Sequence, residues 1–398
     1  MPNLATKEKC TGCAACLNRC GVSAIRMEAD KTGFLFPVID STKCVECKLC
    51  ERACPVLEKI EIPEASPKAY IVQNKDTGTR MQSTSGGAFT AIASSVIERG
   101  GVVYGAAFGD NYVVRHTEEK SQDGLWKFRN SKYVQSEIGN TYKNAEHYLK
   151  HGILVCYSGT PCQIQGLKKF LNKDYENLIT IDFMCRAVPS PKVFQKYVLY
   201  LENKYPSMNK LVFRDKTRGY SYSTLSIYDE NNKSLYRGGS EYDQWLRLFF
   251  KGYCNRESCY SCQFQTGNRV SDFTLWDCWE TQNYAPEWDD NKGTTNVIVW
   301  TEKGQKLFTG ILNKLKSIEI GMDAIDASLE RTTLPRPSFE ANIFWNDVEK
   351  LDNKAFFDIY APFSKKIIIK SFTRHLIWKL HLHNAIRKTV HKVRKLKK

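Results

Sequence analysis

The sequence has no long apolar segment. No run of about 18 apolar residues occurs in the chain, so we expect no membrane-spanning helix. The first residues, MPNLATKEKC, lack the apolar core of a secretory signal, and we therefore expect a cytoplasmic protein. Hydrophobic residues make up 42% of the 398 residues and charged residues 25%, a composition that excludes a disordered, collagen-like or coiled-coil chain.

The sequence also lacks the residue patterns of hydrolytic catalysis. It shows no paired carboxylates and no Ser, His and Asp arrangement, and we expect His116, His147 and His151 at the surface because they occur in polar stretches. Acidic residues are in the minority, with 43 Asp and Glu against 58 Lys and Arg, a net charge of +15. An excess of this sign favours an anionic partner such as nucleic acid, membrane lipid or an acidic substrate.

Cysteine, in contrast, is abundant. There are 15 cysteines, and in a reducing compartment clustered cysteines indicate metal ligands or redox groups rather than disulfides. Cysteines 10, 13, 16 and 20 are spaced C-x2-C-x2-C-x3-C, and the same spacing recurs at 44, 47, 50 and 54, followed by Pro55. This repeat is typical of two-cluster bacterial ferredoxins, in which the fourth cysteine of each motif binds the other cluster.

The repeat predicts an N-terminal ferredoxin-like domain over residues 1–60 with two [4Fe-4S] clusters. The predicted ligands of one cluster are Cys10, Cys13, Cys16 and Cys54, and those of the other are Cys44, Cys47, Cys50 and Cys20. The alternative is a zinc or disulfide staple, but zinc knuckles do not need the repeated third and fourth cysteine. Gly21 stands where a proline usually follows the fourth cysteine, which removes no ligand.

From about residue 67, strand-like apolar runs alternate with helical segments. ILVCY is followed by IQGLKKFL, and LITIDFM is followed by VFQKYVLYLENKY. This alternation predicts an α/β domain over residues 67–330, with a largely parallel sheet where helices cross over. Ser190 and Pro191 suit the start of the helix that follows them, and the polar residues 211–239 indicate hairpins.

One loop of this domain has the features of an anion site. Ser85, Gly86 and Gly87 stand just before a helical segment in STSGGAFTAIASS. Backbone N–H groups and the helix dipole at such a point favour phosphate, although the same residues also suit a simple N-cap and turn. Lys132 in RNSKYVQS has the charge to neutralise a phosphate, the alternative being a solvated side chain.

Seven cysteines lie outside the ferredoxin repeat. Cys162 and Cys185 follow predicted strands, and Cys259 and Cys262 form a C-x2-C pair. Because loops at the carboxyl ends of strands gather on one edge of an α/β sheet, these four indicate a third cluster or a zinc ion. Cys254 is the substitute ligand. We expect Cys156 and Cys278 to be buried without a ligand role.

The motifs STSGGAFTAIA, SKYVQSEIGNTYK, SGTPCQIQGLKKFL, CRAVPSPKVF, SCYSCQF and SDFTLWDCW occur in this order. Over about residues 1–310 the chain resembles the coenzyme F420 hydrogenase/dehydrogenase beta-subunit family, in forms with a fused two-cluster ferredoxin, and this family is related to 7-hydroxymethyl chlorophyll a reductase. The resemblance implies a flavoprotein with FAD and an additional [4Fe-4S] cluster. The chain departs from the family at the segment Leu275–Glu280, LWDCWE, where Trp276 and Glu280 replace two glycines.

The resemblance also implies roles for particular residues. The implied flavin-binding residues are Ser85, Gly86, Gly87 and Lys132, with Gly159 and Thr160 near the flavin or cluster. The implied ligands of the third cluster are Cys162, Cys185, Cys259 and Cys262. The resemblance names no catalytic side chain.

The last part of the chain, residues 331–398, is predicted to be an extension that ends in a basic amphipathic helix. From Lys365 onward there are 12 Lys and Arg and no Asp or Glu, which leaves 46 basic against 43 acidic residues, a net of +3, for residues 1–364. Apolar residues occur at 369, 372, 376, 380, 386, 390 and 393, which is helical spacing. We expect this tail to bind an anionic membrane surface, with a nucleic acid, a docking partner or a solvated tail as alternatives. The nearly neutral body gives no reason to expect nucleic-acid binding.

These features predict an α+β protein that acts as an iron–sulfur flavoprotein oxidoreductase. Electrons are expected to pass between ferredoxin-type clusters and a flavin that exchanges hydride with coenzyme F420 or another organic substrate. The expected partners are a ferredoxin-like donor or acceptor and a redox partner subunit, and the expected location is the cytoplasm or the inner face of the membrane. The alternatives are a non-catalytic electron-relay subunit and a reductase acting in cell-surface polysaccharide biosynthesis.

Overall fold

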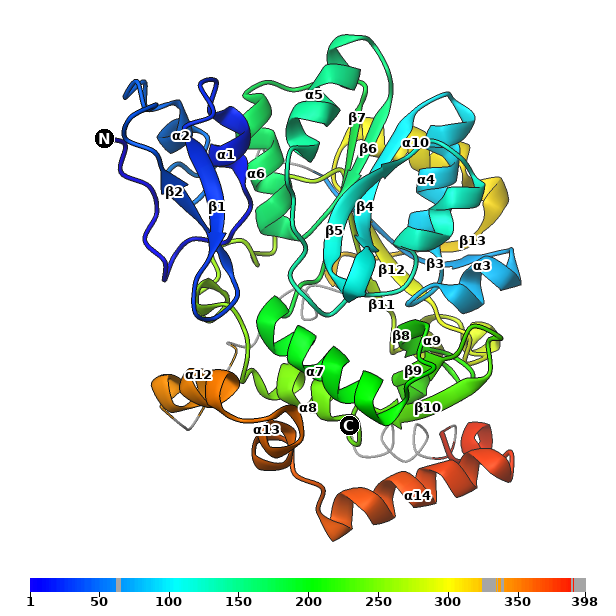
Figure 1. The fold of residues 1–398 in the computed structure, drawn as a ribbon. Coiled ribbons are helices and arrows are strands. Elements are labelled where there is room, and N and C mark those ends of the chain that lie inside the picture. The colour runs from blue at the N-terminus through cyan, green and yellow to red at the C-terminus, as the bar shows by residue number, and fades with distance from the viewer. Residues whose placement is uncertain (62–65, 324–333, 335, 338–339, 388, 390–398) are drawn as a thin grey trace.

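The computed structural model describes the chain apart from residues 62–65, 324–333, 335, 338–339, 388 and 390–398. The protein has an α+β fold in which a small N-terminal domain lies against one side of a domain built on a large sheet (Figure 1). The N-terminal domain contains α1 (Ala15–Arg19), β1 (Ile25–Ala29), β2 (Leu35–Ile39) and α2 (Leu49–Arg52). Strands β1 and β2 pair antiparallel around a turn at residues 31–33.

The large sheet has eight strands in the order β13-β3-β12-β11-β7-β6-β4-β5. Its strands are β3 (Lys68–Asn74), β4 (Val102–Phe108), β5 (Val114–Glu119), β6 (Val155–Ser158), β7 (Leu178–Phe183), β11 (Phe273–Asp277), β12 (Thr295–Val299) and β13 (Leu315–Ile320). The central strands β11, β7, β6 and β4 are parallel, as the sequence predicts, whereas the pairings toward both edges are antiparallel. Strand β3 runs in the same direction as β11 because both are antiparallel to β12.

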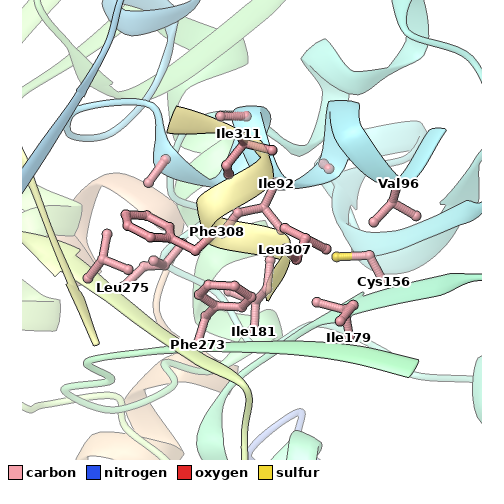
Figure 2. Packing of buried hydrophobic residues seen from close by; sticks show 14 of the residues in the cluster. Ile92, Val96, Cys156, Ile179, Ile181, Phe273, Leu275, Leu307, Phe308 and Ile311 are labelled. Atoms are coloured by element: carbon pink, nitrogen blue, oxygen red, sulfur yellow. The ribbon is translucent and has the colours of Figure 1, made fainter. Parts of the chain in front are cut away.

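Helices cover both faces of this sheet. The helices are α3 (Thr77–Gln82), α4 (Ala88–Glu98), α5 (Thr141–Lys150), α6 (Pro161–Leu171), α9 (Thr281–Tyr284) and α10 (Glu302–Gly310). Figure 2 shows Ile92 of α4 and Leu307 of α10 packed with Cys156 and Ile179 of the sheet. Neighbouring strand residues point to the opposite face, where Tyr157 packs against α5 and α6. Cys156 is therefore buried in the core, as expected.

A smaller antiparallel sheet and more helices complete the body. The sheet order is β10-β9-β8, and the elements are β8 (Lys210–Asp215), β9 (Thr224–Tyr228), β10 (Ser234–Gly239), α7 (Pro191–Lys204), α8 (Gln244–Lys251), α12 (Ala341–Lys350) and α13 (Asn353–Tyr360). Ser190 caps α7 by accepting a hydrogen bond from Val193 N, 3.2 Å away. Phe344 and Phe356, from the region predicted as an extension, are fully buried in this core, so that part of the chain belongs to the body.

The basic tail forms α14 (Lys365–Lys379), which lies along the smaller sheet (Figure 1). Arg374 pairs with Glu241 at 2.6 Å, and Trp378 lies under the guanidinium of Arg218. Residues 390 and 393 of the predicted apolar stripe lie outside the described residues. None of the helices in the described ranges is long and apolar enough to cross a membrane.

Candidate functional site

The structure brings together Cys10, Cys13, Cys16 and Cys54, the four residues predicted to hold one cluster, around one cavity. The pKa of the Cys13 thiol is raised to about 12, mainly by burial and to a smaller extent by the neighbouring Cys54 and Cys10. Burial also raises the pKa of Cys16 and of Cys54. Buried thiols of this kind lose their protons when a metal centre binds them, so the chemistry of the four side chains fits an iron–sulfur cluster. We call this set the inner cysteines.

The second set, Cys20, Cys44, Cys47 and Cys50, lies closer to the surface, and we call these the outer cysteines. Cys47 is exposed and Cys50 is buried, with its pKa raised by burial and then by Cys47. The Sγ of Cys20 accepts a hydrogen bond from Ala24 N at 3.2 Å.

The two motifs turn the backbone in the same way. The residue after the second cysteine of each motif is left-handed, with φ 59° at Ala14 and φ 58° at Lys48, and a helix follows at once. This shared turn brings the third cysteine of each motif onto α1 or α2, beside the first two, and explains why the spacing repeats.

The remaining predicted ligands also meet. Cys162, Cys185, Cys259 and Cys262 line a second cavity. Pro161 and Thr160 begin α6 with a capping box, which places Cys162 in the first turn of the helix. The hydroxyl of Thr160 and the Cys162 Sγ share a hydrogen bond of 3.1 Å. Burial raises the pKa of Cys162, and the nearby Cys262 and Cys259 raise it further.

The other cysteines lie apart from this cavity. Cys254 is fully buried in the core of the smaller sheet, where burial raises its pKa to about 12, so it does not replace any of the four. Cys278 is buried beside Ile71. Within the described ranges, no three His, Cys, Asp or Glu side chains converge closely enough to hold a single metal ion.

The two cavities are neighbours. Thr11 lines both of them, and the Cys13 thiol is close enough to Cys162 to affect its pKa. Gly166, one turn after Cys162 on α6, makes this approach possible, since a Cβ there would lie 2.9 Å from the Cys13 Sγ. The inner cysteines therefore pack directly on the helix that carries Cys162.

Two further side chains fasten the ferredoxin loop to the α/β domain. Gln135 Nε2 donates to the Thr11 carbonyl at 2.9 Å, and Arg256 Nε donates to the Cys10 carbonyl at 2.7 Å. Gly12, with φ +70°, lies between them, and a Cβ there would come within 2.8 Å of both side chains. Sequence reasoning missed these contacts, although Gln135 belongs to the motif SKYVQS and Arg256 stands between Cys254 and Cys259.

The residues predicted to bind a flavin phosphate are occupied by contacts within the protein. Gly86 N donates to Thr295 Oγ1 at 2.7 Å, and a Cβ at Gly86 would lie 2.4 Å from the Val72 carbonyl. The Ser85 hydroxyl shares a hydrogen bond of 2.8 Å with the same Thr295 oxygen. Gly87, with φ 84°, serves as the N-cap of α4. The loop therefore closes on β3 and β12 rather than forming an open cradle.

Lys132 and the residues near Cys162 do not complete such a site either. The Lys132 ammonium donates to the carbonyls of Lys127 and Arg129 at 2.7 and 2.9 Å, and burial lowers its pKa to about 7. Gly159 N pairs with the Ile181 carbonyl at 3.0 Å, and Thr160 serves the first turn of α6. In the described part of the chain, none of the six residues lines the cavities above or the pocket below. Thr160 lies beside Cys162, where the resemblance expects it, and the flavin role of the six residues remains a prediction.

His116 was predicted to be exposed, and that prediction is wrong. Its ring is buried against Tyr157, and its Nε2 lies 2.9 Å from the Ser158 carbonyl. Since a carbonyl only accepts, Nε2 carries the proton, and Nδ1 has no partner among the described residues. Burial lowers the pKa of His116 to about 4. His147 and His151 are exposed, as expected.

An open pocket lies where β11 ends. Tyr220 and Trp279 stack along its wall with ring centres 4.5 Å apart, and Cys278 is buried at its edge. The neighbouring strand β7 ends beside it, because Met184 N donates to the Leu275 carbonyl at 3.3 Å. Cys185 of the second cavity is the next residue, so the pocket and that cavity occupy adjacent strand ends.

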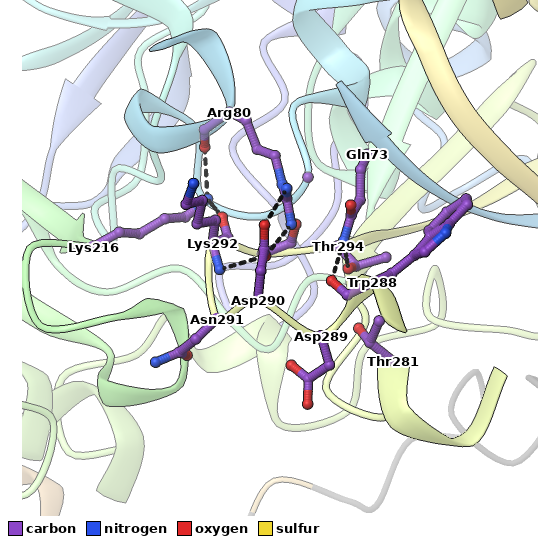
Figure 3. A network of polar contacts seen from close by, with 12 residues as sticks. Gln73, Arg80, Lys216, Thr281, Trp288, Asp289, Asp290, Asn291, Lys292 and Thr294 are labelled. Carbon is purple, nitrogen blue, oxygen red and sulfur yellow. Dashed lines mark hydrogen bonds and ion pairs between the residues drawn. The ribbon is translucent and has the colours of Figure 1, made fainter. Parts of the chain in front are cut away.

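A polar network holds the loop on the other side of this pocket (Figure 3). Arg80 forms two hydrogen bonds with Asp290, at 2.9 and 2.6 Å. The Lys216 ammonium donates to the carbonyls of Arg80 and Lys292, both at 2.7 Å, and to that of Ser85. Burial lowers the pKa of Lys216 to about 7. Lys216 thus connects the Ser85 loop to the pocket wall.

Two family models match parts of the chain. Residues 153–322 match the family described as the C-terminal part of the beta chain of coenzyme F420 hydrogenase/dehydrogenase, and residues 9–57 match the 4Fe-4S dicluster domain. A chain of the F420-reducing [NiFe] hydrogenase complex from Methanosarcina barkeri is 16% identical, with a TM-score of 0.46 over 68% of this chain and 90% of that chain. A search of curated proteins gave no match.

Proposed function

We propose that the chain is a relative of the coenzyme F420 hydrogenase/dehydrogenase beta subunits with a 4Fe-4S dicluster domain in front, since residues 153–322 match the C-terminal domain of that family and residues 9–57 match the dicluster domain. From this premise we propose that it passes electrons through three [4Fe-4S] clusters to an organic acceptor. Its class is iron–sulfur oxidoreductase subunit. The proposal adds two features to the two clusters of the dicluster domain. One is the organic acceptor, and the other is a third cluster held by Cys162, Cys185, Cys259 and Cys262.

The observation that carries this proposal is the continuity of the two cysteine-lined cavities. They share Thr11, and Cys13 packs on Gly166 of the helix that carries Cys162. An electron on the inner cluster would therefore be separated from the third cluster by a short, buried stretch of protein. The role of the chain is to hold these centres in a fixed order, to exclude water and to set their potentials.

Iron analysis of anaerobically purified protein tests the third cluster. Three clusters give about twelve iron atoms per chain, and Cys162→Ser should remove about four of them. Cys254→Ser is the matched control, because Cys254 is buried nearby in sequence but lies outside the cavity. About eight iron atoms in the wild-type protein, unchanged in Cys162→Ser, would refute the third cluster.

The pocket at the end of β11 is our candidate for the organic acceptor. Trp279, which is 54% exposed and stacks on the buried Tyr220, offers a flat apolar surface to an aromatic ring system, as FAD or coenzyme F420 would present. A bound flavin supplies the conversion between single electrons and hydride. We assign it none of the six residues first predicted. Quantification of flavin, and titration of the wild type and Trp279→Ala with FAD and with F420, test this assignment; equal binding by both proteins would refute it.

The closed Ser85–Gly87 loop favours a second candidate function, that of a relay subunit. In this role the chain would pass electrons to a partner subunit that holds the catalytic cofactor, and it would contain no flavin of its own. Purified protein with a full iron content and no flavin, unreactive toward F420 until a partner is added, is the result expected of a relay.

We further propose that the tail holds the protein at an anionic membrane surface. Contacts of Arg374 and Trp378 fasten one face of α14 to the body. The outward side chains include Ile369, Phe372 and Leu376, with Phe372 66% exposed, among lysines that favour anionic lipid. Vesicles with and without phosphatidylserine, mixed with the full chain and with a chain ending at Ser364, test this; equal sedimentation of both proteins would refute the role of the tail.

A further inference from the structure

The guanidinium of Arg256 is completely buried at the boundary between the two domains, with 0% of the side chain exposed. Besides the Cys10 carbonyl, it donates from Nη1 to Gln135 Oε1 at 2.9 Å and from Nη2 to the Leu35 carbonyl at 3.0 Å. Nη2 also lies 3.7 Å from the Sγ of Cys10, within hydrogen-bonding distance for sulfur. The group therefore contacts an inner cysteine through both its backbone and its sulfur.

The oxygen atoms that accept from Arg256 belong to two carbonyls and one amide, which carry no net charge. The rings of Phe34 and Phe36 lie 5.2 and 4.3 Å from the guanidinium carbon, and no carboxylate in the described part of the chain forms an ion pair with Arg256. Three other buried arginines pair with carboxylates, namely Arg80 with Asp290, Arg214 with Asp277 and Arg269 with Asp182. Arg247, which is also buried, donates to the carbonyls of Ala361 and Pro362 and, within the described ranges, has no contact with a cysteine of the cluster motifs. A buried charge without a counterion is costly, so this position favours an anionic group beside Cys10.

A [4Fe-4S] cluster bound by four thiolates is such a group, and its negative charge increases on reduction. Hydrogen bonds to the sulfurs and nearby positive charge stabilise the reduced form and raise the reduction potential. We propose that Arg256 raises the potential of the inner cluster above that of the outer cluster. Arg256 acts through Cys10, as a positioning and charge-setting residue.

The outer cysteines have a different environment, with Cys47 exposed to solvent. A higher potential at the inner cluster makes it the favoured resting place for an electron that enters at the outer cluster. Arg256 also stands three residues before Cys259, whose N–H donates to the Arg256 carbonyl at 2.9 Å. The same short segment thus contacts Cys10 of the inner cysteines and supplies Cys259 of the second cavity. The inference rests on the proposed electron path and adds a direction to it.

Redox titration followed by electron paramagnetic resonance tests this inference on the purified chain. The outer cluster of the same molecule is the internal reference, identified by the change of its signal in Cys47→Ser. In Arg256→Gln we expect the inner cluster to become at least tenfold harder to reduce relative to the outer cluster, which is about 59 mV for a one-electron couple. Arg256→Lys keeps the charge and should retain most of the difference.

A second variant keeps the test valid if Arg256→Gln loses iron. Gln135→Glu leaves Arg256 in place and gives it a carboxylate partner. This variant, like Arg256→Gln, should therefore lower the reduction potential of the inner cluster. An unchanged separation of the two potentials in either iron-loaded variant would overturn the proposal. The outcome is independent of the third cluster, because an iron count of about eight with a shifted inner potential would refute that cluster and still support the role of Arg256.

Discussion

The inner and outer cysteines share one sequence motif and have very different surroundings. Around the inner set, Gln135 and Arg256 hold the backbone of the loop, and Gly166 admits Cys13 to the surface of α6. Around the outer set, Cys47 is exposed and its neighbour Val45 is 64% exposed. A repeated sequence has thus become two sites, one packed on the α/β domain and one that reaches the solvent at Cys47.

This difference indicates a division of work. An exposed cluster can exchange electrons with a soluble partner, whereas a buried one is protected from solvent and held at a fixed place beside the next centre. Substitutions of the inner cysteines should therefore disturb the fold and the electron transfer within the protein. Equivalent substitutions of the outer cysteines should disturb mainly the exchange of electrons with a partner.

The largest expected effect separates Cys13→Ser from Cys47→Ser. Each variant should lose about four iron atoms. Cys13 also packs in a core with Tyr142 and Leu167, so Cys13→Ser should lower the free energy of unfolding by about 3 kcal/mol more than Cys47→Ser. Iron analysis with urea unfolding measures both quantities, and equal destabilisation of the two variants would remove the distinction between the sites.

The pH dependence of stability tests the packing around His116, which lies beside the loop that leads to Cys162. The folded protein holds its pKa at about 4, below the ordinary value of 6.5, so unfolding takes up a proton when the pH lies between these values. The contribution of the neutral ring is complete above pH 6.5 and is lost as the pH falls, by about 3 kcal/mol at pH 4. The contact of His116 with Ser158 supports the loop that leads to Cys162.

His116→Gln keeps a donor for the Ser158 carbonyl and removes the titrating group. We expect the unfolding free energy of this variant to fall less than that of the wild type between pH 7.5 and 5.5, by about 1 kcal/mol. The exposed His147 is the control, and His147→Gln should follow the wild type. Parallel pH profiles for all three proteins would show that His116 does not contribute.

The sequence predicted those features that follow from local spacing. The cysteine motifs and the alternation of strands and helices depend on neighbouring residues, and so does the capping of α7 by Ser190. The hydrogen bonds of Arg256 and Gln135 to the loop at Cys10 could not be predicted in this way, because Arg256 and Cys10 are 246 positions apart. The polar context of His116 likewise gave no sign of the tertiary packing that covers its ring, and the glycines before α4 suited a tight packing as well as a phosphate.

A smaller loss of stability is expected from adding a methyl group at Gly166, where the ferredoxin loop approaches α6. A Cβ at Gly166 would press on the Cys13 Sγ, and in Gly166→Ala the ferredoxin loop must move, at a cost of about 1–3 kcal/mol. Gly21, next to the outer Cys20, is the matched control, since no described atom lies within 4 Å of its Cβ position. Stopped-flow reduction should show slower transfer beyond the inner cluster in Gly166→Ala and an unchanged rate in Gly21→Ala.

The smallest expected effect concerns the surface contact between the domains. Glu58 pairs with Lys169 of α6 at 2.9 Å, and the Glu58 side chain is 51% exposed. Such ion pairs contribute less than about 1 kcal/mol and weaken with salt. Gln135→Ala, in contrast, removes buried hydrogen bonds to Thr11 and Arg256, for which about 1–3 kcal/mol is expected. Urea unfolding of both variants compares the two contributions. If Glu58→Gln lowers the free energy of unfolding as much as Gln135→Ala does, surface charges hold the domains together. The buried contacts would then not explain why the inner cysteines are more firmly fixed than the outer ones.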